Sequence, residues 1–488
     1  MPKKYREENL NAPLSNYING KLIASKSFDM LPVFNPSTGR VISEMPVSTS
    51  DMVEEAVSAA RKAQVSWGQR PAIQRANVLR AISARIRERG EPIARIISEE
   101  QGKLLGLAKV EVAFAADYLD YMAEWARRIE GEIIESDRPG ENIFLFRKPV
   151  GVVGAILPWN FPFFLIVRKL GPALVTGNSI VIKPSEETPL NAAAFIELLD
   201  GLDIPEGLIN FVYGTGAGVG EAICAHPHVD LISFTGSAAT GARIMATAAR
   251  NITKVNLELG GKAPAIVLKD ADLDKAAKAV AASRTLNSGQ VCNAAERVYV
   301  ERQVAEEFGA RVTEEMKRIR VGDPLGGSEV EMGPMINQAG VRKVEELVQS
   351  ALSSGATVTT GGRGTADEGK GTFYEPTVLT GCHQDMDVMR KEIFGPVLPI
   401  MAVDSLEEAI SLANDTEYGL TSSIYTESLS SALKASRELS FGETYVNREN
   451  FEAMQGFHAG NRKSGIGGAD GKHGLYEYTS THVVYIQT

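Results

Sequence analysis

The chain has 488 residues, a hydrophobic content of 44% that is ordinary for a globular protein, and a formal net charge of −10 at pH 7. One hydrophobic core rarely covers a chain of this length, so we expect two or three lobes. The acidic balance would repel nucleic acid and anionic lipid, and we therefore expect a small molecule as the partner.

Neither secretion nor membrane insertion is predicted. The opening residues 1–20 contain no apolar segment, and the chain has no run of about 18 apolar residues. The cysteines, at positions 224, 292 and 382, form neither a disulfide framework nor a metal-ligand spacing. We therefore expect a cytoplasmic protein with reduced thiols and no structural metal.

The first predicted elements are helices, followed by a hairpin. Residues 51–132 carry amphipathic patterns with few helix breakers. Two β-prone runs follow at 131–136 and 142–147, and the segment Asp-Arg-Pro-Gly-Glu-Asn between them is a turn signal.

From residue 151, short apolar runs alternate with helical patterns. The first of these runs is 151–157, the last is 255–261, and helices are predicted after Pro162 and after Thr188. Such alternation requires crossover connections, so it predicts an α/β fold with a parallel sheet covered on both faces.

A second series of apolar runs, from 265–268 to 444–447, predicts another α/β lobe. The β-prone run at 482–486 is left over near the end of the chain. It could pair with the predicted hairpin or with a strand of another subunit.

Cys292, in Asn-Ser-Gly-Gln-Val-Cys-Asn, is a candidate nucleophile. A thiol with a pKa of about 8.5 is only a few per cent ionised at neutral pH, so catalysis would need local activation or a transient base. The alternative is an inert core cysteine, the commoner environment of an isolated free thiol. The polar neighbours of Cys292 weigh against that alternative.

Glu258 and Asn160 each follow an apolar strand, where parallel sheets place their ligands. A partly desolvated Glu258 would have a raised pKa that suits a general base, and the Asn160 amide could stabilise an oxyanion. The alternatives are a helix cap or solvated turn for Glu258, and the cap of the helix near Pro162 for Asn160.

The segment 234–241, Phe-Thr-Gly-Ser-Ala-Ala-Thr-Gly, joins a predicted strand to a predicted helix. Ser237 and the free backbone N–H groups there could meet a phosphate. The G-x-G-x-x-G dinucleotide pattern is absent, and the glycines of 214–220 have a different spacing that by itself indicates only a flexible turn.

Ordered motifs along nearly the whole chain resemble the aldehyde dehydrogenase superfamily. They are Pro158-Trp-Asn-Phe-Pro, Lys183-Pro-Ser-Glu, Phe234-Thr-Gly-Ser, Leu257-Glu-Leu-Gly-Gly-Lys, Asn287-Ser-Gly-Gln-Val-Cys, Met332-Gly-Pro, Glu392-Ile-Phe-Gly-Pro-Val and Asn414-Asp-Thr-Glu-Tyr-Gly-Leu. Within the superfamily, the chain is similar to the bacterial lactaldehyde and glycolaldehyde dehydrogenase group through the segments 121–128, 136–142 and 447–458.

The resemblance implies catalytic roles at matching positions. Cys292 would attack the aldehyde, with the Asn160 amide and the Cys292 backbone N–H holding the oxyanion, and a thioester would remain after hydride transfer. Glu258 would activate the hydrolytic water and could help to deprotonate the thiol. Relatives that pass the thioester to coenzyme A usually lack this carboxylate, so its presence favours hydrolysis.

The resemblance also implies a dinucleotide site built from Trp159, Lys183, Glu186, Gly216, Gly220, Gly236, Ser237, Glu392 and Phe394. Glu186 could accept hydrogen bonds from the adenosine ribose and would repel a 2′-phosphate, so NAD is expected over NADP. Alternatively, Glu186 is solvated and Lys183 alone determines which of the two cofactors is tolerated. In that case NADP is also accepted.

For the substrate, the resemblance also implies a contrast. Many family members that oxidise apolar aldehydes line the substrate tunnel with aromatic residues at the positions where this chain has Arg168, Glu452 and His458. Together with Asn293, these polar residues predict a site for a short α-hydroxyaldehyde. In the alternative, Arg168 and Glu452 form a structural ion pair and His458 is an incidental loop residue. Other small aldehydes or semialdehydes, a non-catalytic protein on the same scaffold, and a cysteine hydrolase also remain open.

We expect a Rossmann-type cofactor lobe over 1–127 and 149–260, a catalytic lobe over 261–460, and a β arm over 128–148 with the C-terminal segment 461–488. The resemblance implies a homodimer or homotetramer in which the arm adds a strand to a neighbour's sheet.

Overall fold

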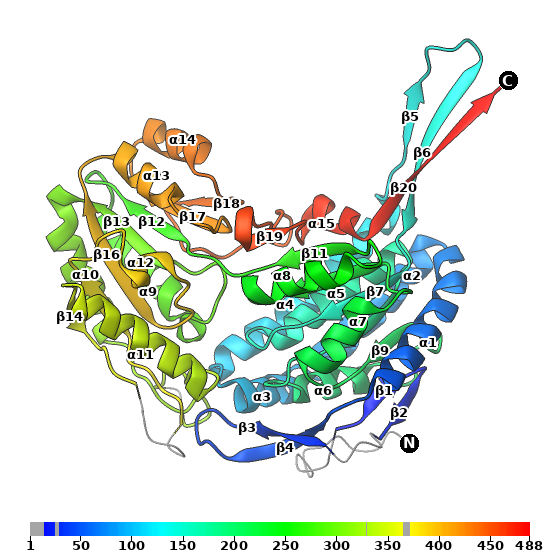
Figure 1. Cartoon of the computed structure of the whole chain (residues 1–488), viewed down its shortest axis with the longest axis horizontal. Coiled ribbons are helices and arrows are strands. Elements are labelled where there is room, and N and C mark those ends of the chain that lie inside the picture. Colours follow the sequence, from blue (N-terminus) through cyan, green and yellow to red (C-terminus); the bar gives the residue numbers. More distant parts are fainter. Residues whose placement is uncertain (1–13, 25–28, 328, 365–370) are drawn as a thin grey trace.

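The computed structural model describes residues 14–24, 29–327, 329–364 and 371–488. Residues 1–13, which belong to the opening segment expected to carry no leader, lie outside the described residues. Two lobes face each other, and a β arm extends from the first of them (Figure 1). None of the helices in the described ranges is both long enough and apolar enough to cross a membrane.

The predicted parallel sheet forms the centre of the first lobe. Its strand order is β19-β11-β10-β7-β8-β9-β1-β2, with parallel pairing from β11 to β9 and antiparallel pairing at both edges. The strands are β1 (Asn16–Ile18), β2 (Lys21–Ile23), β7 (Val152–Ile156), β8 (Ser179–Lys183), β9 (Ile209–Phe211), β10 (Leu231–Thr235), β11 (Lys254–Glu258) and β19 (Gly465–Ile466).

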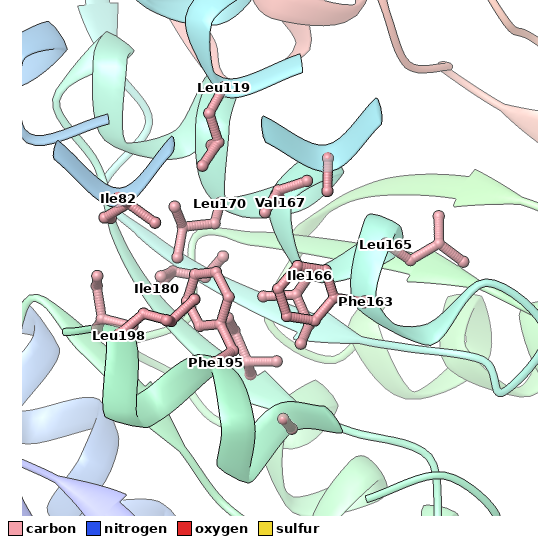
Figure 2. Packing of buried hydrophobic residues seen from close by; sticks show 14 of the residues in the cluster. Ile82, Leu119, Phe163, Leu165, Ile166, Val167, Leu170, Ile180, Phe195 and Leu198 are labelled. Atoms are coloured by element: carbon pink, nitrogen blue, oxygen red, sulfur yellow. The ribbon is translucent and has the colours of Figure 1, made fainter. Parts of the chain in front are cut away.

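Helices cover both faces of this sheet, as the alternating pattern predicts. They are α1 (Ser50–Gln69), α2 (Ala72–Glu88), α3 (Gly90–Gln101), α4 (Leu105–Glu124), α5 (Pro162–Thr176), α6 (Leu190–Leu198), α7 (Glu221–Ala225) and α8 (Ala238–Ala248). Hydrophobic residues of α7, α8 and the first part of α1 pack on one face, and those of α2 to α6 and the end of α1 pack on the other. Figure 2 shows this second core, where Leu119, Leu170 and Phe195 meet.

Helix α5 lies at the centre of that core, and all of its residues are buried. A helix that is apolar on every side is typical of a protein interior. It nevertheless carries two consecutive charged residues, Arg168 and Lys169, which are 4% and 0% exposed. Buried charges need partners, so this pair indicates a polar site beside the helix.

The second lobe contains the other predicted α/β sheet, ordered β14-β15-β16-β13-β12-β17-β18. Its strands are β12 (Pro264–Val267), β13 (Arg297–Glu301), β14 (Thr357–Thr360), β15 (Thr377–Thr380), β16 (Val397–Val403), β17 (Thr421–Tyr425) and β18 (Glu443–Val446). Its helices are α9 (Leu273–Thr285), α10 (Ala305–Lys317), α11 (Gln338–Ser353), α12 (Asp387–Arg390), α13 (Leu406–Asn414) and α14 (Leu429–Glu438).

The predicted hairpin is confirmed as β5 (Glu132–Glu135) and β6 (Glu141–Pro149), and the left-over C-terminal run pairs with it. Strand β20 (Thr479–Gln487) runs antiparallel to β6, with His482 opposite Phe146. The arm sheet exposes apolar side chains, including Ile133 at 80% and Tyr485 at 64%.

The sequence patterns do not predict the N-terminal strands β1 and β2, nor the hairpin of β3 (Met30–Phe34) and β4 (Val41–Pro46). The C-terminal segment is also more divided than expected. Strand β19 joins the first sheet, α15 (Gly471–Glu477) contacts α5, and only β20 enters the arm. This return of the chain brings residues near 470 to α5.

Candidate active site

Residues of both lobes line a cavity of about 250 Å³. It brings together a large part of the residues expected from the sequence. These are Trp159, Asn160, Arg168, Gly236, Ser237, Glu258, Cys292, Asn293, Glu392, Phe394, Glu452 and His458. Gly216 and Gly220 line a separate cavity of about 380 Å³, and Lys183 and Glu186 border neither cavity.

Cys292 is half-buried at the cavity, whereas Cys224 and Cys382 are buried. Burial raises the pKa of both Cys224 and Cys382 to about 12, which makes these two thiols unreactive near neutral pH. Cys224 and Cys382 are thus core cysteines, whereas Cys292 is only partly buried and borders the cavity.

The loop before Cys292 has an unusual backbone. Asn287, Ser288 and Gly289 follow one another with φ of 49°, 59° and 73°. Left-handed conformations cost energy in residues other than glycine and persist only where surrounding contacts enforce them. Here the Ser288 hydroxyl donates to the Gly333 carbonyl at 2.8 Å, and the Arg284 guanidinium donates to the Gly289 carbonyl. The nucleophile candidate therefore sits on a rigid loop.

A buried carboxylate, Glu296, anchors this loop from behind. It pairs with Lys262 at 2.7 Å and Arg284 at 2.8 Å, and it accepts the backbone N–H groups of Ile393 at 2.8 Å and Phe394 at 3.0 Å. Burial would raise its pKa, but the two cations hold that pKa at about 2. The network ties the Cys292 loop to the Glu392–Phe394 segment.

Glu258 ends β11 at the cavity, where it is 4% exposed. The helix-cap and solvated-turn alternatives are therefore wrong. Its Oε2 lies 3.1 Å from Lys169 Nζ and accepts a hydrogen bond from Thr235 Oγ1 at 2.9 Å. Its Oε1 is buried and has no hydrogen-bond partner in the described part of the chain.

The expected raised pKa of Glu258 is wrong. Burial would raise it, but Lys169, Arg168 and His458 outweigh burial and hold the pKa at about 2. The carboxylate is therefore ionised at neutral pH, and its affinity for a proton is weaker than that of an unpaired buried glutamate.

Asn160 does not cap α5, so that alternative is also wrong. Glu111 of α4 performs this role, because its Oε1 accepts the N–H groups of Phe163 at 2.9 Å and Phe164 at 3.1 Å. The Asn160 amide instead lines the cavity and donates to the Gln290 carbonyl at 3.0 Å. Nζ of the buried Lys103 donates a hydrogen bond to the backbone carbonyl of Asn160 at 2.7 Å.

One end of the cavity is densely charged. The Arg168 guanidinium donates to both carboxylate oxygens of Asp470, with 3.1 Å between Nε and Oδ1, and it lies 3.6 Å from Glu452 Oε1. Asp470 is 2% exposed. The ion pair of Arg168 with Glu452, which the sequence offered as the alternative to a substrate role, is therefore present, but Asp470 makes the closer and bidentate contact.

Asn293 extends this polar end toward Cys292. Its amide nitrogen donates to Glu452 Oε2, and its Oδ1 is buried with no hydrogen-bond partner in the described part of the chain. An unpaired buried acceptor is costly, so it is suited to a donor that a ligand brings.

His458 is 2% exposed and is held by its neighbours, so the alternative of an incidental loop residue is wrong. Its Nδ1 lies 2.7 Å from Glu443 Oε1. Burial and Arg168 lower the pKa of His458, but Glu452, Cys292 and Glu443 outweigh them and raise the pKa well above the usual value.

Several residues expected to hold a dinucleotide lie at the start of α8 and in the turn before α7, and their chemistry is compatible with one. Ser237 caps α8 by accepting the Thr240 N–H at 3.3 Å, and the other N–H groups of the first turn could donate to an anion. Glu186 accepts the Gly216 N–H at 2.5 Å and pairs with Lys183 at 2.9 Å. Residues 216–220 form a π-helical turn.

At the cavity, the Phe394 and Trp159 rings meet edge to face, with centroids 5.6 Å apart. Glu392 Oε1 accepts the Gly261 N–H at 3.0 Å. A Cβ at Gly260 would stand 2.2 Å from this oxygen, so a larger residue there would displace the Glu392 carboxylate. Within the described ranges, no group of three or more His, Cys, Asp or Glu residues could hold a metal ion.

Comparison with known proteins agrees with this geometry. The profile of the Aldehyde dehydrogenase family matches residues 22–484. The chain belongs to that family. It is 57% identical to lactaldehyde dehydrogenase of Escherichia coli (strain K12) over 97% of this chain and 98% of the relative. A crystal structure of that E. coli enzyme has a TM-score of 0.96 and covers 98% of this chain and 100% of its own.

Two further members of the aldehyde dehydrogenase family differ in the cofactor named for them. D-glyceraldehyde dehydrogenase (NADP(+)) of Thermoplasma acidophilum is 38% identical over 96% of this chain and 95% of the relative. A crystal structure of betaine aldehyde dehydrogenase from Staphylococcus aureus in complex with NAD+ is 35% identical, with a TM-score of 0.94, and covers 97% of this chain and 95% of its own. Family membership thus implies a nicotinamide dinucleotide without choosing between the two.

Sequence patterns missed three charged residues of this aldehyde dehydrogenase: Lys169 beside Glu258, Asp470 beside Arg168, and Glu443 beside His458. Lys169 had a signal, because consecutive charges in an otherwise apolar helix require buried partners. Asp470 and Glu443 lie in segments with no local pattern that distinguishes them from surface residues.

Proposed function

We propose that this aldehyde dehydrogenase oxidises a short α-hydroxyaldehyde, lactaldehyde or glycolaldehyde, to the carboxylic acid. The charged end of the cavity carries the proposal. Arg168 and Glu452 offer a donor and an acceptor there, and the unpaired Asn293 Oδ1 can accept from a substrate hydroxyl. A site built to hydrogen-bond a hydroxyl rejects the analogue that lacks it, because its polar groups would then stay unpaired.

Similarity to the E. coli enzyme supports this substrate class, since the polar residues belong to a chain that is 57% identical to a lactaldehyde dehydrogenase. Lactaldehyde and glycolaldehyde both carry a hydroxyl next to the aldehyde. The charged end of the cavity would recognise this hydroxyl by hydrogen bonds.

Cys292 is the proposed nucleophile. Attack of its sulfur on the aldehyde carbon forms the S–C bond and moves the carbonyl π pair onto oxygen, where the Asn160 amide donates a hydrogen bond. The bound nicotinamide supplies the hydride acceptor. The rigid loop at 287–289 orients the sulfur before the aldehyde arrives, which lowers the entropic cost of the attack.

Glu258 is the proposed base for hydrolysis of the thioester. Its ionised carboxylate is ready to accept a proton, and the unpaired Oε1 is free to hold a water. Lys169 weakens the base while the ion pair persists. Deacylation therefore includes a turn of the carboxylate away from Lys169 toward the thioester.

For the cofactor we propose NAD over NADP. Ser237 and the N-terminus of α8 would hold the pyrophosphate, Gly216 and Gly220 the adenosine side, and Glu392, Phe394 and Trp159 the nicotinamide ribose. The Glu186 carboxylate would accept the ribose hydroxyls and repel a 2′-phosphate. Its pairing with Lys183 reduces that repulsion, so NADP is used less well rather than excluded.

The arm supports a homodimer or homotetramer. Its sheet leaves edge strands and apolar side chains such as Ile133 exposed, and a second subunit would cover both. We place the enzyme in the cytoplasm, in keeping with its free cysteines.

The decisive test is an initial-rate comparison of lactaldehyde, glycolaldehyde and propionaldehyde with NAD and with NADP. The wild type should favour the hydroxylated aldehydes by kcat/KM, and Glu452→Phe should remove that preference. Equal rates with propionaldehyde in the wild type would refute the polar-pocket proposal. Acid formation without reduced nicotinamide would instead indicate a cysteine hydrolase.

A further inference from the structure

Asn160, the proposed oxyanion donor, is held at both its backbone and its side chain. Its backbone carbonyl accepts hydrogen bonds from Lys103 Nζ at 2.7 Å and from Asn287 Nδ2 at 3.3 Å. Its side-chain amide donates to the Gln290 carbonyl at 3.0 Å. An amide nitrogen carries two N–H groups, so the other one is left to donate into the cavity that Asn160 lines.

These partners come from two different parts of the molecule. Asn287 and Gln290 lie on the loop that carries Cys292, so their contacts link the amide to the sulfur. Lys103 lies between α3 and α4 in the first lobe. The position of Asn160 therefore depends on the nucleophile loop on one side and on Lys103 on the other.

Lys103 is itself fixed by a carboxylate. Its side chain and that of Glu111 are fully buried, and the two form an ion pair. Lys103 Nζ also lies 3.6 Å from the centroid of the Phe161 ring. The other oxygen of Glu111 accepts the N–H of Phe163 at 2.9 Å. The pair thus contacts Asn160 and the residues that follow it at the start of α5.

The ion pair does not border the substrate. Neither Lys103 nor Glu111 lines the cavity of about 250 Å³. A buried ion pair stabilises a fold little more than apolar residues of the same volume, because the loss of hydration offsets most of the attraction. What the pair does provide is a fixed direction for the groups that it contacts, and these converge on the segment that carries the oxyanion donor.

We propose that Lys103, held by Glu111, is a positioning residue that aims the Asn160 amide at the oxyanion. The inference rests on the proposed function, because it assumes that Asn160 stabilises the oxygen of an aldehyde attacked by Cys292. Negative charge develops on that oxygen during the attack and again during hydrolysis of the thioester, so both steps need the donor in place. A displacement of about 1 Å can slow such a step by about a hundredfold.

Lys103→Met in the full-length protein tests this role, because methionine keeps much of the length of lysine but donates no hydrogen bond. With lactaldehyde and NAD, kcat should fall by roughly thirtyfold while KM changes by less than about twofold, since the oxyanion is absent from the ground state. Lys103→Arg keeps a cationic donor and should recover part of kcat.

Alkylation of Cys292 by iodoacetamide separates positioning of the amide from damage to the whole site. Displacement of iodide creates no oxyanion, so the alkylation rate of Lys103→Met should equal that of the wild type. The rate is measured by mass spectrometry of the Cys292 peptide. A loss of alkylation as large as the loss of kcat would mean that Lys103 merely supports the fold, and would overturn the inference.

A double-mutant cycle shows whether Lys103 acts through Asn160. Asn160→Ala removes the amide and keeps the backbone carbonyl that Lys103 contacts. In this background, adding Lys103→Met should lower kcat by less than about threefold, because there is no amide left to position. A further loss of roughly thirtyfold would show that Lys103 acts independently of the amide and would overturn the inference.

Two further variants deal with stability. Lys103→Met leaves a buried carboxylate unpaired, which costs stability, whereas Lys103→Met/Glu111→Gln removes both charges and keeps an acceptor for the Phe163 N–H. This double variant should show the same loss of kcat. Arg75→Met is the matched control, since the buried Arg75 donates to the Val175 carbonyl at 2.9 Å near the other end of α5. Its kcat per folded molecule should equal that of the wild type.

Failure of the inference and failure of the proposed function give different results. If Asn160→Ala is slow but folded Lys103→Met/Glu111→Gln keeps the wild-type kcat, only the role of Lys103 is refuted. If Asn160→Ala oxidises lactaldehyde as fast as the wild type, the oxyanion role of Asn160 in the proposed function is refuted, and the role of Lys103 is refuted with it.

Discussion

Two buried charge clusters flank Cys292, and they differ in how completely their partners are matched. On the loop side, Glu296 accepts hydrogen bonds from Lys262, Arg284 and two backbone N–H groups, and none of these three side chains lines the cavity of about 250 Å³. On the cavity side, Arg168, Glu452 and His458 are also buried or nearly so, but they border open space.

The comparison shows that burial of charge does not by itself mark a functional site. In the Glu296 cluster both carboxylate oxygens are paired, although Arg284 Nε has no hydrogen-bond partner in the described part of the chain, and the cluster supports the loop. The cavity cluster leaves Asn293 Oδ1 and Glu258 Oε1 without partners in the described part of the chain, so a ligand or water can complete it. Unmatched polar atoms beside open volume, rather than charge, distinguish the proposed substrate site.

The largest expected effect is that of replacing Cys292, which lies between the two clusters. Cys292→Ser should lower aldehyde oxidation by at least about ten-thousandfold, because a serine hydroxyl is not ionised there and its attack is slow. The measurement is the absorbance of reduced nicotinamide. Cys382→Ser, a change at a buried thiol remote from the cavity, should leave the rate per folded molecule unchanged. Unchanged aldehyde oxidation in Cys292→Ser would show that Cys292 is not the nucleophile.

Glu258→Gln should slow steady-state turnover by roughly a thousandfold, while the first burst of reduced nicotinamide persists. The thioester forms but its hydrolysis lacks a base. Rapid-mixing absorbance separates the two steps. Glu477→Gln is the control, because it breaks a second Lys–Glu pair at the other end of β11, where Glu477 meets Lys254 at 2.9 Å. Loss of the burst itself in Glu258→Gln would contradict this role.

The Glu296 cluster should respond in stability. Glu296→Gln leaves Lys262 and Arg284 underpaired and should cost about 3 kcal/mol of unfolding free energy. The folded pKa of about 2 lies below the ordinary 4.5, so Glu296 stabilises fully above the unfolded pKa and loses this contribution as pH falls toward 2. Denaturant-induced unfolding at several pH values measures this contribution. The control is Glu417→Gln, which removes an exposed carboxylate paired with Lys463. Equal stability of wild type and Glu296→Gln would contradict the support role.

Asp470→Asn tests the cavity cluster from outside its lining. Without the bidentate carboxylate, Arg168 loses its fixed orientation, and kcat/KM for hydroxylated aldehydes should fall by roughly tenfold to thirtyfold. Propionaldehyde should lose much less, since it has no hydroxyl to place. An equal loss with both kinds of aldehyde would mean that Asp470 supports the fold instead of specificity.

The smallest effect concerns Glu186, a half-exposed charge that belongs to neither cluster. Glu186→Gln removes the repulsion of a 2′-phosphate, so the preference for NAD over NADP should shrink by about fivefold. The ratio of kcat/KM for the two cofactors measures this. An unchanged ratio would assign cofactor choice to Lys183 alone.

The sequence alone predicted the larger elements because their signals are local. Alternating apolar runs predicted both sheets, and a turn signal between β-prone runs predicted the β5–β6 hairpin. Ordered motifs indicated the family, which the profile match confirms. Strands β1 to β4 were not predictable in the same way, since they are short and lie at sheet edges or in a separate hairpin.

Electrostatic properties were predicted less well, and Glu258 shows why. Its burial followed from the strand that precedes it, but the direction of its pKa shift depends on Lys169, which is remote in the chain and close in space. The partner of Arg168 is Asp470, from the C-terminal segment that returns to α5. The partner of His458 is Glu443, which lies on β18.

By itself, the sequence determined the order of the larger strands and helices, the family, and a candidate cysteine, carboxylate and amide. Only the tertiary structure decided which charges face each other and which polar atoms remain unmatched. The physical reason is that hydrophobic periodicity is carried by neighbours in the chain, whereas Coulomb and hydrogen-bond energies depend on distances of a few ångströms between residues that folding alone brings together.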